Sequence, residues 1–285
     1  MQDNFSNYHP LVNFLLLISL MVFSMFFMNP ILLIISYVTA LIYSVYIKSK
    51  KVIKNSIIVV IIFTIINPIF NEEGNTILLS MFNHKITLES VGYGIASGVM
   101  FSTVLLWFGV FNNIMTSDKI MYIFSKALPS ISLTICMIFR LIPDFKNRIK
   151  EIDRGQKALG NRVEEKRLME KIKYSLNIVF ILISWCFESA LETADSMKTR
   201  GFGLKHRTSY YPFRFKQCDK ILMIIIVVLD IMIIYSWIKG ETTMQFFPSI
   251  EKCNTRAYTI VSYGILCSIP IMLNIQEAIK WKLLK

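Results

Sequence analysis

The chain has 285 residues, of which 54% are apolar and 18% are charged, and its formal net charge is +12. It is too apolar for a water-soluble protein of this size and too charged for a chain that lies wholly in lipid. This balance predicts a membrane protein with a sizeable aqueous part. The five cysteines and three histidines are scattered, which excludes a disulfide framework and a zinc site as expectations.

Six apolar stretches have the length and composition of membrane-spanning helices. About 18 residues of α-helix reach roughly 27 Å, which is close to the thickness of the hydrocarbon core of a bilayer. No basic stretch precedes the first of them, so a cleaved signal peptide is not expected. The predicted spans cover residues 11–28, 31–47, 52–70, 91–111, 221–238 and 257–273.

Two of these spans contain residues that need an explanation. Gly94, Gly98 and Ser102 share one face of the fourth span, a spacing that favours close packing against another helix. Asp230 lies in the middle of the fifth span. A carboxylate there indicates either a hydrogen bond between helices or a site for a substrate or proton, and the first alternative is favoured.

Between the fourth and fifth spans the sequence predicts two long amphipathic helices. The first carries an apolar stripe from Ile138 to Ile152, and Pro143 should either kink it or mark its true start. The second carries a stripe from Ile172 to Met197. Its acidic line is interpreted as a solvated face rather than a metal or acid–base group: Glu188, Glu192 and Asp195.

Each of these helices ends at a glycine beside basic residues. Glycine just past the last turn is a usual way to end a helix, and a cation there suits the negative end of the helix dipole. For one helix this capping role would be sufficient. Two similar ends on a pair of helices inserted between spans indicate a device that grips a partner and moves with it.

The distribution of lysine and arginine predicts the orientation in the membrane. Lys48, Lys50, Lys51 and Lys54 place the loop after the second span in the cytoplasm. Alternation then places both termini and the long insertion there too. The predicted organisation is a four-span bundle (1–112), a cytoplasmic region of coupling helices (113–219) and a final pair of spans (220–285). The positive charge reflects this topology, so nucleic acid is not an expected partner.

Motifs for catalysis are absent from the sequence. There is no GxxxxGK[ST] phosphate-binding loop, no HExxH, no GxSxG and no His/Cys cluster. Neither an enzyme site nor a cofactor is therefore expected in this chain.

Six blocks between about residue 67 and residue 214 carry a family resemblance. They read NPIFNEEGNTILL, ITLESVGYGIASG, LLWF, MTSDKIMYIFSKALP, MIFRLIPDFKNRI and ETADSMKTRGFGLKHRT. In this order they resemble the transmembrane T component of energy-coupling factor (ECF) transporters, which are ABC importers of vitamins and some metal ions in prokaryotic cell membranes.

The resemblance implies an all-α polytopic membrane protein, with about six transmembrane helices and two long amphipathic cytoplasmic coupling helices. In such transporters a membrane-embedded S component binds the substrate, and two cytoplasmic ABC ATPases hydrolyse ATP. The T component joins them and is not itself an enzyme. The S component chooses the transported solute, which this sequence therefore does not name.

In that family each coupling helix ends in an Ala-Arg-Gly type motif that docks into one ATPase. The two motifs correspond here to Thr199, Arg200 and Gly201, and to Ala158, Leu159 and Gly160. Leucine replaces the arginine in the earlier motif, which leaves Lys157, Arg154 or Arg162 to supply the charge. The difference between the two ends favours two non-identical ATPases.

Two alternatives stay open at this point. A membrane-anchored scaffold or regulator would use the basic insertion to bind anionic lipid or a soluble partner without transport. A stand-alone secondary transporter would use Asp230. An importer core should co-purify with ATPases, whereas a secondary transporter should not.

Overall fold

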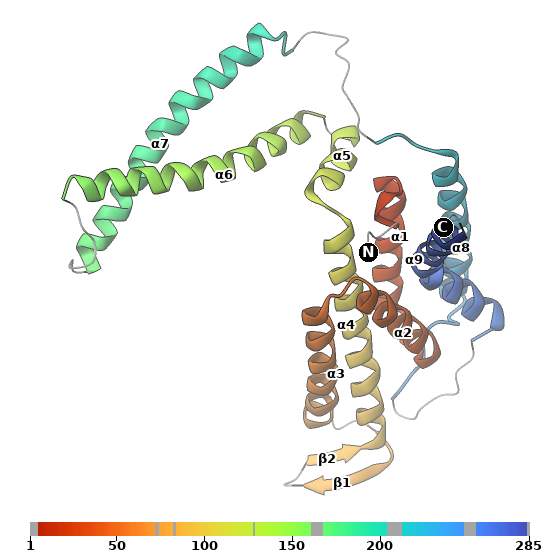
Figure 1. Ribbon diagram of the computed structural model, residues 1–285. Helices are drawn as coiled ribbons and strands as arrows, with labels where there is room; N and C mark the ends of the chain where they lie inside the picture. Colours follow the sequence, from red (N-terminus) through yellow and green to blue (C-terminus); the bar gives the residue numbers. More distant parts are fainter. Residues whose placement is uncertain are drawn as a thin grey trace. The chain divides into compact units, whose positions relative to one another are not determined.

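A computed structural model describes residues 5–71, 74–81, 84–127, 129–160, 168–203, 213–247 and 255–283. Contacts divide the chain into two compact units, of which unit 1 is Met1–Ile120 with Phe213–Lys285 and unit 2 is Met121–Pro212. Most of the described chain is helical (Figure 1). This confirms the predicted all-α fold class.

Each of the six predicted spans coincides with one helix of unit 1. α3, α4, α8 and most of α9 are long and apolar enough to cross a bilayer, whereas α1 and α2 are apolar but only 17 residues long. Pro10 and Pro30 begin α1 and α2, where their missing N–H groups cost no helical hydrogen bond. The helices are α1 (Pro10–Phe26), α2 (Pro30–Tyr46), α3 (Lys50–Phe70), α4 (Leu88–Ile114), α8 (Gln217–Ile238) and α9 (Ala257–Leu283).

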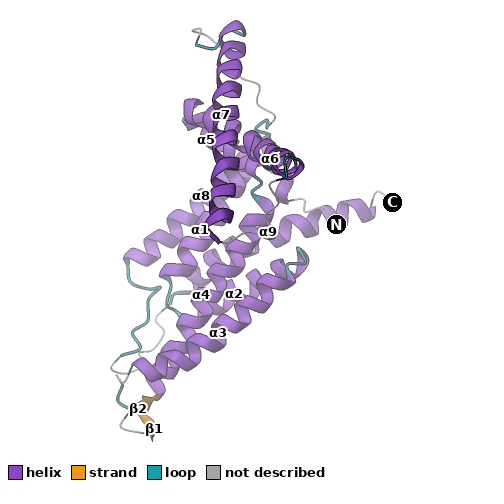
Figure 2. Cartoon of the chain, turned by 90° about the vertical axis from the view of Figure 1, so that its left-hand side faces the viewer, coloured by secondary structure: helices purple, strands orange, loops and turns teal. Residues whose placement is uncertain are grey.

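A β-hairpin that the sequence analysis did not predict joins α3 to α4. Strand β1 (Ile77–Met81) pairs antiparallel with strand β2 (His84–Thr87) (Figure 2). The Thr87 hydroxyl then caps α4, and the buried Glu89 carboxylate accepts hydrogen bonds from the N–H and hydroxyl of Thr76. Strands of four and five residues leave too weak a pattern to be recognised in a polar loop.

Small residues let α3 and α4 pack closely, which confirms the interpretation of Gly94, Gly98 and Ser102 in the fourth span. A methyl group added at Gly98 would lie 3.1 Å from the Val60 carbonyl oxygen of α3. The Ser102 hydroxyl donates a hydrogen bond to the Ser56 carbonyl oxygen at 3.1 Å. Close backbone approach of this kind replaces the hydrophobic driving force, which lipid does not provide between helices.

Asp230 joins two helices of unit 1. The Ser19 hydroxyl of α1 donates a hydrogen bond to Asp230 Oδ2 of α8 at 2.8 Å. This is the hydrogen bond between helices that the sequence analysis favoured.

Unit 2 contains the two long helices that the sequence predicts. They are α6 (Pro129–Ala158) and α7 (Leu168–Thr199), and the division between the units falls within the short helix α5 (Ser117–Ala127). Pro143 lies inside α6, so the alternative that it marks the start of the helix is wrong. By length and composition alone α7 also passes as a membrane span.

The packing of α3 on α4 can be tested with two alanine variants. Gly98→Ala and Gly264→Ala should gain the same intrinsic helix propensity, because both glycines lie inside helices. An added methyl group at Gly264 meets no atom nearer than 4.0 Å, whereas Gly98 is crowded by Val60 and Phe63. We expect Gly98→Ala to be the less stable variant by about 1–3 kcal/mol, as measured by unfolding in detergent. Equal stabilities would contradict the close approach.

Candidate functional site

The two long helices of unit 2 cross near the end of α6 and the beginning of α7. The Tyr174 hydroxyl donates a hydrogen bond to Asp153 Oδ1 at 2.8 Å, and Lys157 pairs with Asp153 Oδ2 at 2.8 Å. Lys157 first and Tyr174 second lower the pKa of Asp153 below its usual 3.8. The carboxylate therefore stays ionised at neutral pH. The crossing would lose this charge, and the stability it contributes, only as the pH falls through the lowered pKa of Asp153.

Aromatic contacts extend the crossing along both helices. The rings of Phe145 and Trp185 meet edge to face, with centroids 6.2 Å apart. The Arg148 guanidinium lies 5.1 Å from the centre of the Trp185 ring and forms an ion pair with Glu151 at 2.8 Å. A cation over the face of an indole ring is attracted by its quadrupole. These contacts show that α6 and α7 run antiparallel where they meet.

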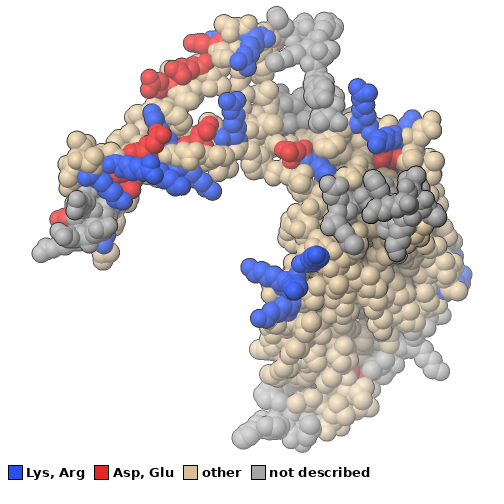
Figure 3. All heavy atoms as spheres, viewed as in Figure 1, with Lys and Arg blue, Asp and Glu red and all other residues tan. Residues whose placement is uncertain are grey.

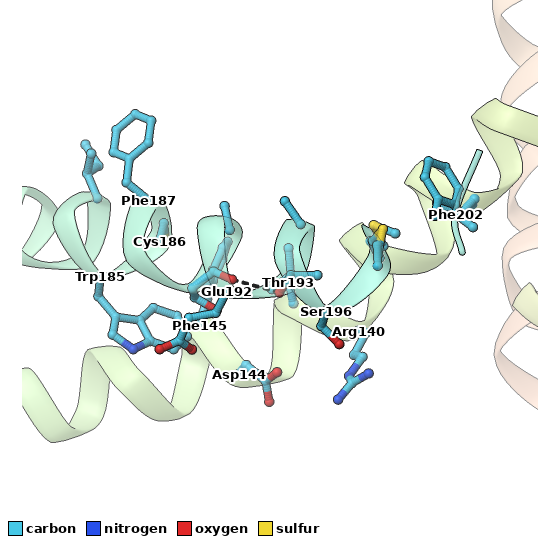
Figure 4. Close-up of a pocket in the computed structure, with 18 of the residues that line it drawn as sticks. Arg140, Asp144, Phe145, Trp185, Cys186, Phe187, Glu192, Thr193, Ser196 and Phe202 are labelled. Atoms are coloured by element: carbon cyan, nitrogen blue, oxygen red, sulfur yellow. Dashed lines mark hydrogen bonds between the residues drawn. The ribbon is translucent and has the colours of Figure 1, made fainter. Parts of the chain in front are cut away.

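A cleft of about 1070 Å³ opens between α6 and α7 beyond the crossing (Figure 4). Figure 4 places Phe145 and Trp185 at one end of it, and Arg140 and Phe202 at the other. Its lining is mainly apolar and includes Met137, Leu141, Ile183, Ala190, Ala194 and Met197. A cleft of this composition between helices is typical of a surface that receives an apolar partner.

The apolar stripes of α6 and α7 stay largely exposed in this chain. Ile142 is 42% exposed, and Leu176 and Phe187 of α7 are 50% and 70% exposed. Tyr174 is the one side chain of α7 classed as buried in the part of the chain that the structure describes. Most of each stripe therefore needs a covering from lipid or from a partner.

The acidic line of α7 is exposed, as the sequence analysis expected. Glu188, Glu192 and Asp195 are exposed to solvent in this chain. Across the described residues no group of three or more His, Cys, Asp or Glu side chains has the geometry of a metal site. Figure 3 shows acidic and basic side chains distributed along the two helices of unit 2.

The ends of α6 and α7 share one backbone geometry. Gly160 and Gly201 both have positive φ, of 86° and 76°. The Gly160 N–H donates to the Lys157 carbonyl oxygen at 3.1 Å, and the Gly201 N–H donates to the Lys198 carbonyl oxygen at 3.0 Å. In α7 the Phe202 N–H also reaches the Met197 carbonyl oxygen at 3.0 Å, which completes a Schellman motif.

Leu159 and Arg200 occupy the same position in these two helix ends, immediately before the left-handed glycine. Ala158 and Thr199 precede them, and the Thr199 hydroxyl donates to the Ser196 carbonyl oxygen at 2.9 Å. Leu159 is 78% exposed, and Arg200 is also exposed. The structure thus presents a large apolar side chain at one end and a guanidinium at the other on the same backbone frame.

The basic residues that could replace the missing arginine differ in their surroundings. Lys157 is held by Asp153 within α6. Arg154 is exposed, and Arg162 lies outside the described residues. Since Lys157 already serves the crossing, Arg154 is the better placed of the described candidates to offer a charge to a partner.

Comparison with known proteins identifies the family of this chain. Residues 4–210 match the family described as CbiQ, cobalt transport protein. The chain belongs to the CbiQ family. This CbiQ-family chain is 25% identical over 188 residues to the energy-coupling factor transporter transmembrane protein EcfT of Staphylococcus aureus, covering 61% of this chain and 69% of that protein. It is 27% identical over 187 residues to EcfT of Streptococcus equi, covering 60% of this chain and 68% of that protein.

These matches make the chain a transmembrane T component of an ECF transporter, which confirms the resemblance seen in the sequence. As a member of the CbiQ family it is a multi-pass membrane component of a transporter and not itself the catalytic subunit. The matched region includes both long helices and both of their glycine-terminated ends.

The contacts that hold the crossing were missed by the sequence analysis. Tyr174 and Trp185 carry it from α7, and Asp153 and Arg148 carry it from α6. A tyrosine and a tryptophan at helical spacing within an apolar stripe were the available signal. Their partners could not be chosen from sequence, because the pairing depends on where two helices cross.

Gly155 inside α6 and Gly160 just past its end make a matched test of the helix end. Gly160→Ala should weaken the last turn of α6 by roughly 1–2 kcal/mol, since an L-residue with a side chain is strained at positive φ. Gly155→Ala should stabilise the same helix by up to about 1 kcal/mol, because Gly155 lies in open space in its interior. Hydrogen exchange of residues 153–160 would measure both effects, and slower exchange in Gly160→Ala would contradict the assignment.

Proposed function

We propose that this chain couples two cytoplasmic ABC ATPases to a membrane-embedded, substrate-binding S component in an ECF-type importer. The observation that carries the proposal is the pair of matching helix ends, with Leu159 and Arg200 exposed at equivalent positions. Two equivalent ends on two crossed helices suit a pair of related partners. ATP hydrolysis belongs to those partners.

The two ends would grip their ATPases by different chemistry. The planar guanidinium of Arg200 can form a bidentate, charge-assisted pair with a carboxylate. Leu159 would instead bury apolar surface, with Lys157, Arg154 or Arg162 close in sequence to add charge. The remaining docking residues are Ala158, Gly160 and Lys157 at one end and Thr199 and Gly201 at the other. Non-identical ATPases follow most simply from this difference.

The S component would cover the apolar surface that unit 2 leaves open. The cleft between α6 and α7, together with the exposed stripe that includes Leu176 and Phe187, offers an apolar face that this chain does not bury itself. Movement of an ATPase at a helix end would then move the surface on which the S component rests. Vitamins or other micronutrients are the expected cargo, and the S component selects among them.

The proposed location is a prokaryotic cell membrane, with both termini and unit 2 on the cytoplasmic side. Lys50, Lys51 and Lys54 are exposed at the beginning of α3, and Figure 3 shows lysines gathered there. Contacts of unit 1 bring the N-terminal segment together with the end of α4, the beginning of α8 and the later part of α9. This agrees with six spans that alternate in direction.

The docking role of Arg200 can be tested against a neighbouring lysine. Arg200→Ala should leave a partner carboxylate unpaired, at a cost of roughly 2–5 kcal/mol, while the chain still inserts and folds. Lys198→Ala removes the same charge two residues earlier in α7 and should have a much smaller effect. Co-purification of ATPases and substrate uptake would be measured for both variants. Normal ATPase binding and normal uptake in Arg200→Ala would refute the proposal.

The proposed orientation makes a separate prediction about two cysteines. In intact cells that express single-cysteine variants of the chain, a membrane-impermeant thiol reagent should label Cys253 and spare Cys218. Cys218 lies exposed in the first turn of α8, so it should react once the membrane is permeabilised. Cys253 lies outside the described residues. Labelling of Cys218 but not Cys253 in intact cells would reverse the orientation.

A further inference from the structure

The short segment before α1 is anchored far more firmly than its polar composition suggests. Phe5 begins the 3₁₀ turn Phe5–Asn7 and is fully buried. Its N–H donates to Asn274 Oδ1 of α9 at 3.3 Å, and the Asn274 amide donates in turn to the Tyr43 hydroxyl of α2 at 3.4 Å. The segment is therefore fixed to two helices of unit 1 before the first span begins.

A buried lysine joins this segment to the junction of α4 and α5. Lys119 is only 7% exposed, although it lies in the first turn of α5. Its ammonium group donates to the Ser6 carbonyl oxygen at 2.6 Å, to the Ser6 hydroxyl at 2.8 Å and to the Ile114 carbonyl oxygen at 3.0 Å. Burying an ammonium group is costly unless such acceptors surround it. The Ile114 carbonyl belongs to the last turn of α4, where a cation also suits the helix dipole.

The same segment holds the chain where it returns to the membrane unit. The His9 N–H donates to Asp219 Oδ1 at 3.2 Å, and Asp219 Oδ2 accepts from the Lys216 N–H at 2.9 Å to cap α8. The rings of His9 and Phe215 lie 4.5 Å apart. Asp219 is 3% exposed, so this contact too is desolvated and strong.

These contacts lie beside both crossings into unit 2. The chain passes from unit 1 to unit 2 after Ile120 and returns at Phe213. Lys119 is therefore next to the departure, and Phe215 and Asp219 follow the return. We define the N-terminal clasp as Phe5–His9 together with Lys119, Phe215, Asp219 and Asn274.

We propose that the N-terminal clasp holds both segments that lead into unit 2, and that Lys119 is the positioning residue for the outgoing one. The inference rests on the proposed coupling function. A movement of α6 and α7 reaches unit 1 only if the segments that connect the two units are held in place. The last turn of α4 and the first turn of α8 must therefore not shift when α6 and α7 move. Without the clasp, the ATPases would still bind and hydrolyse ATP, but less of each ATP-driven movement would reach unit 1.

Hydrogen exchange of the full chain in lipid nanodiscs tests the clasp directly. Lys119→Met keeps the length and apolar stem of the side chain and removes the ammonium group. We expect at least about tenfold faster exchange in residues 5–9 and 114–120, because losing even one of the three charged hydrogen bonds corresponds to that factor. Residues 213–219 should also exchange faster, because one segment holds both sides. A merely local role for Lys119 would leave residues 213–219 unchanged, and that result would overturn the proposal.

Two further variants complete the experiment. Ser6→Ala removes one acceptor and should give a smaller change in the same regions, which keeps the test valid if Lys119→Met does not fold. Lys220→Met removes the same charge from an exposed position in α8 and should change nothing. An equal effect of Lys220→Met, or no effect of either clasp variant, would refute the clasp.

The functional consequence is measured in the assembled transporter. Lys119→Met should retain its ATPases while the ATP hydrolysed per substrate imported rises several-fold. An unchanged ratio despite faster exchange would overturn the positioning role. If the wild-type chain binds no ATPases, the proposed function fails, whereas the exchange experiment still decides whether the clasp exists.

Discussion

The crossing of α6 and α7 is the contact on which the rest of unit 2 depends. Asp153, Tyr174 and the pair Phe145–Trp185 hold two helices of 30 and 32 residues together from one end of each to its middle. Because Asp153 lies five residues before the end of α6, the Leu159 end stays close to the crossing. Arg200 lies about 26 residues beyond Tyr174, roughly 39 Å along the helix. The Arg200 end therefore lies further than the Leu159 end from the Asp153–Tyr174 contact, whereas the Phe145–Trp185 contact lies near the middle of both helices.

The position of the crossing also explains why so much apolar surface stays open. Antiparallel helices whose contacts run only from one end of each helix to its middle cannot cover stripes that run along their full length. Hydropathy alone would make α7 a membrane span, yet Glu188, Glu192 and Asp195 occupy its exposed surface. A helix that is apolar enough for lipid and charged along one face fits a surface shared between the membrane boundary and a protein partner. The cleft and the exposed stripe are thus one consequence of this limited contact.

The sequence predicted those features that depend on local chemistry. Periodicity identified all six spans and both long helices, and Gly160 and Gly201 marked the helix ends because only glycine adopts positive φ at little cost. Gly98 identified the packing face of α4 for a similar reason. The missed features depend on tertiary contacts: the β-hairpin, the partner of Tyr174, and the burial of Lys119. A lysine near a helix start is ordinarily exposed to solvent, and the sequence around Lys119 gives no sign that Ser6 covers it.

The two docking ends separate backbone geometry from side-chain chemistry. Left-handed glycine, the same carbonyl hydrogen bond and an exposed preceding residue recur at both ends, so the frame is a property of the helix terminus. What differs is Leu159 against Arg200. Apolar burial hardly depends on salt, whereas a charge-assisted pair weakens as ions screen it. A partner groove shaped for leucine would leave a guanidinium desolvated and unpaired, and a groove with a carboxylate would gain nothing from leucine. Identical partners cannot suit both ends equally well, and this is the physical basis for proposing two different ATPases.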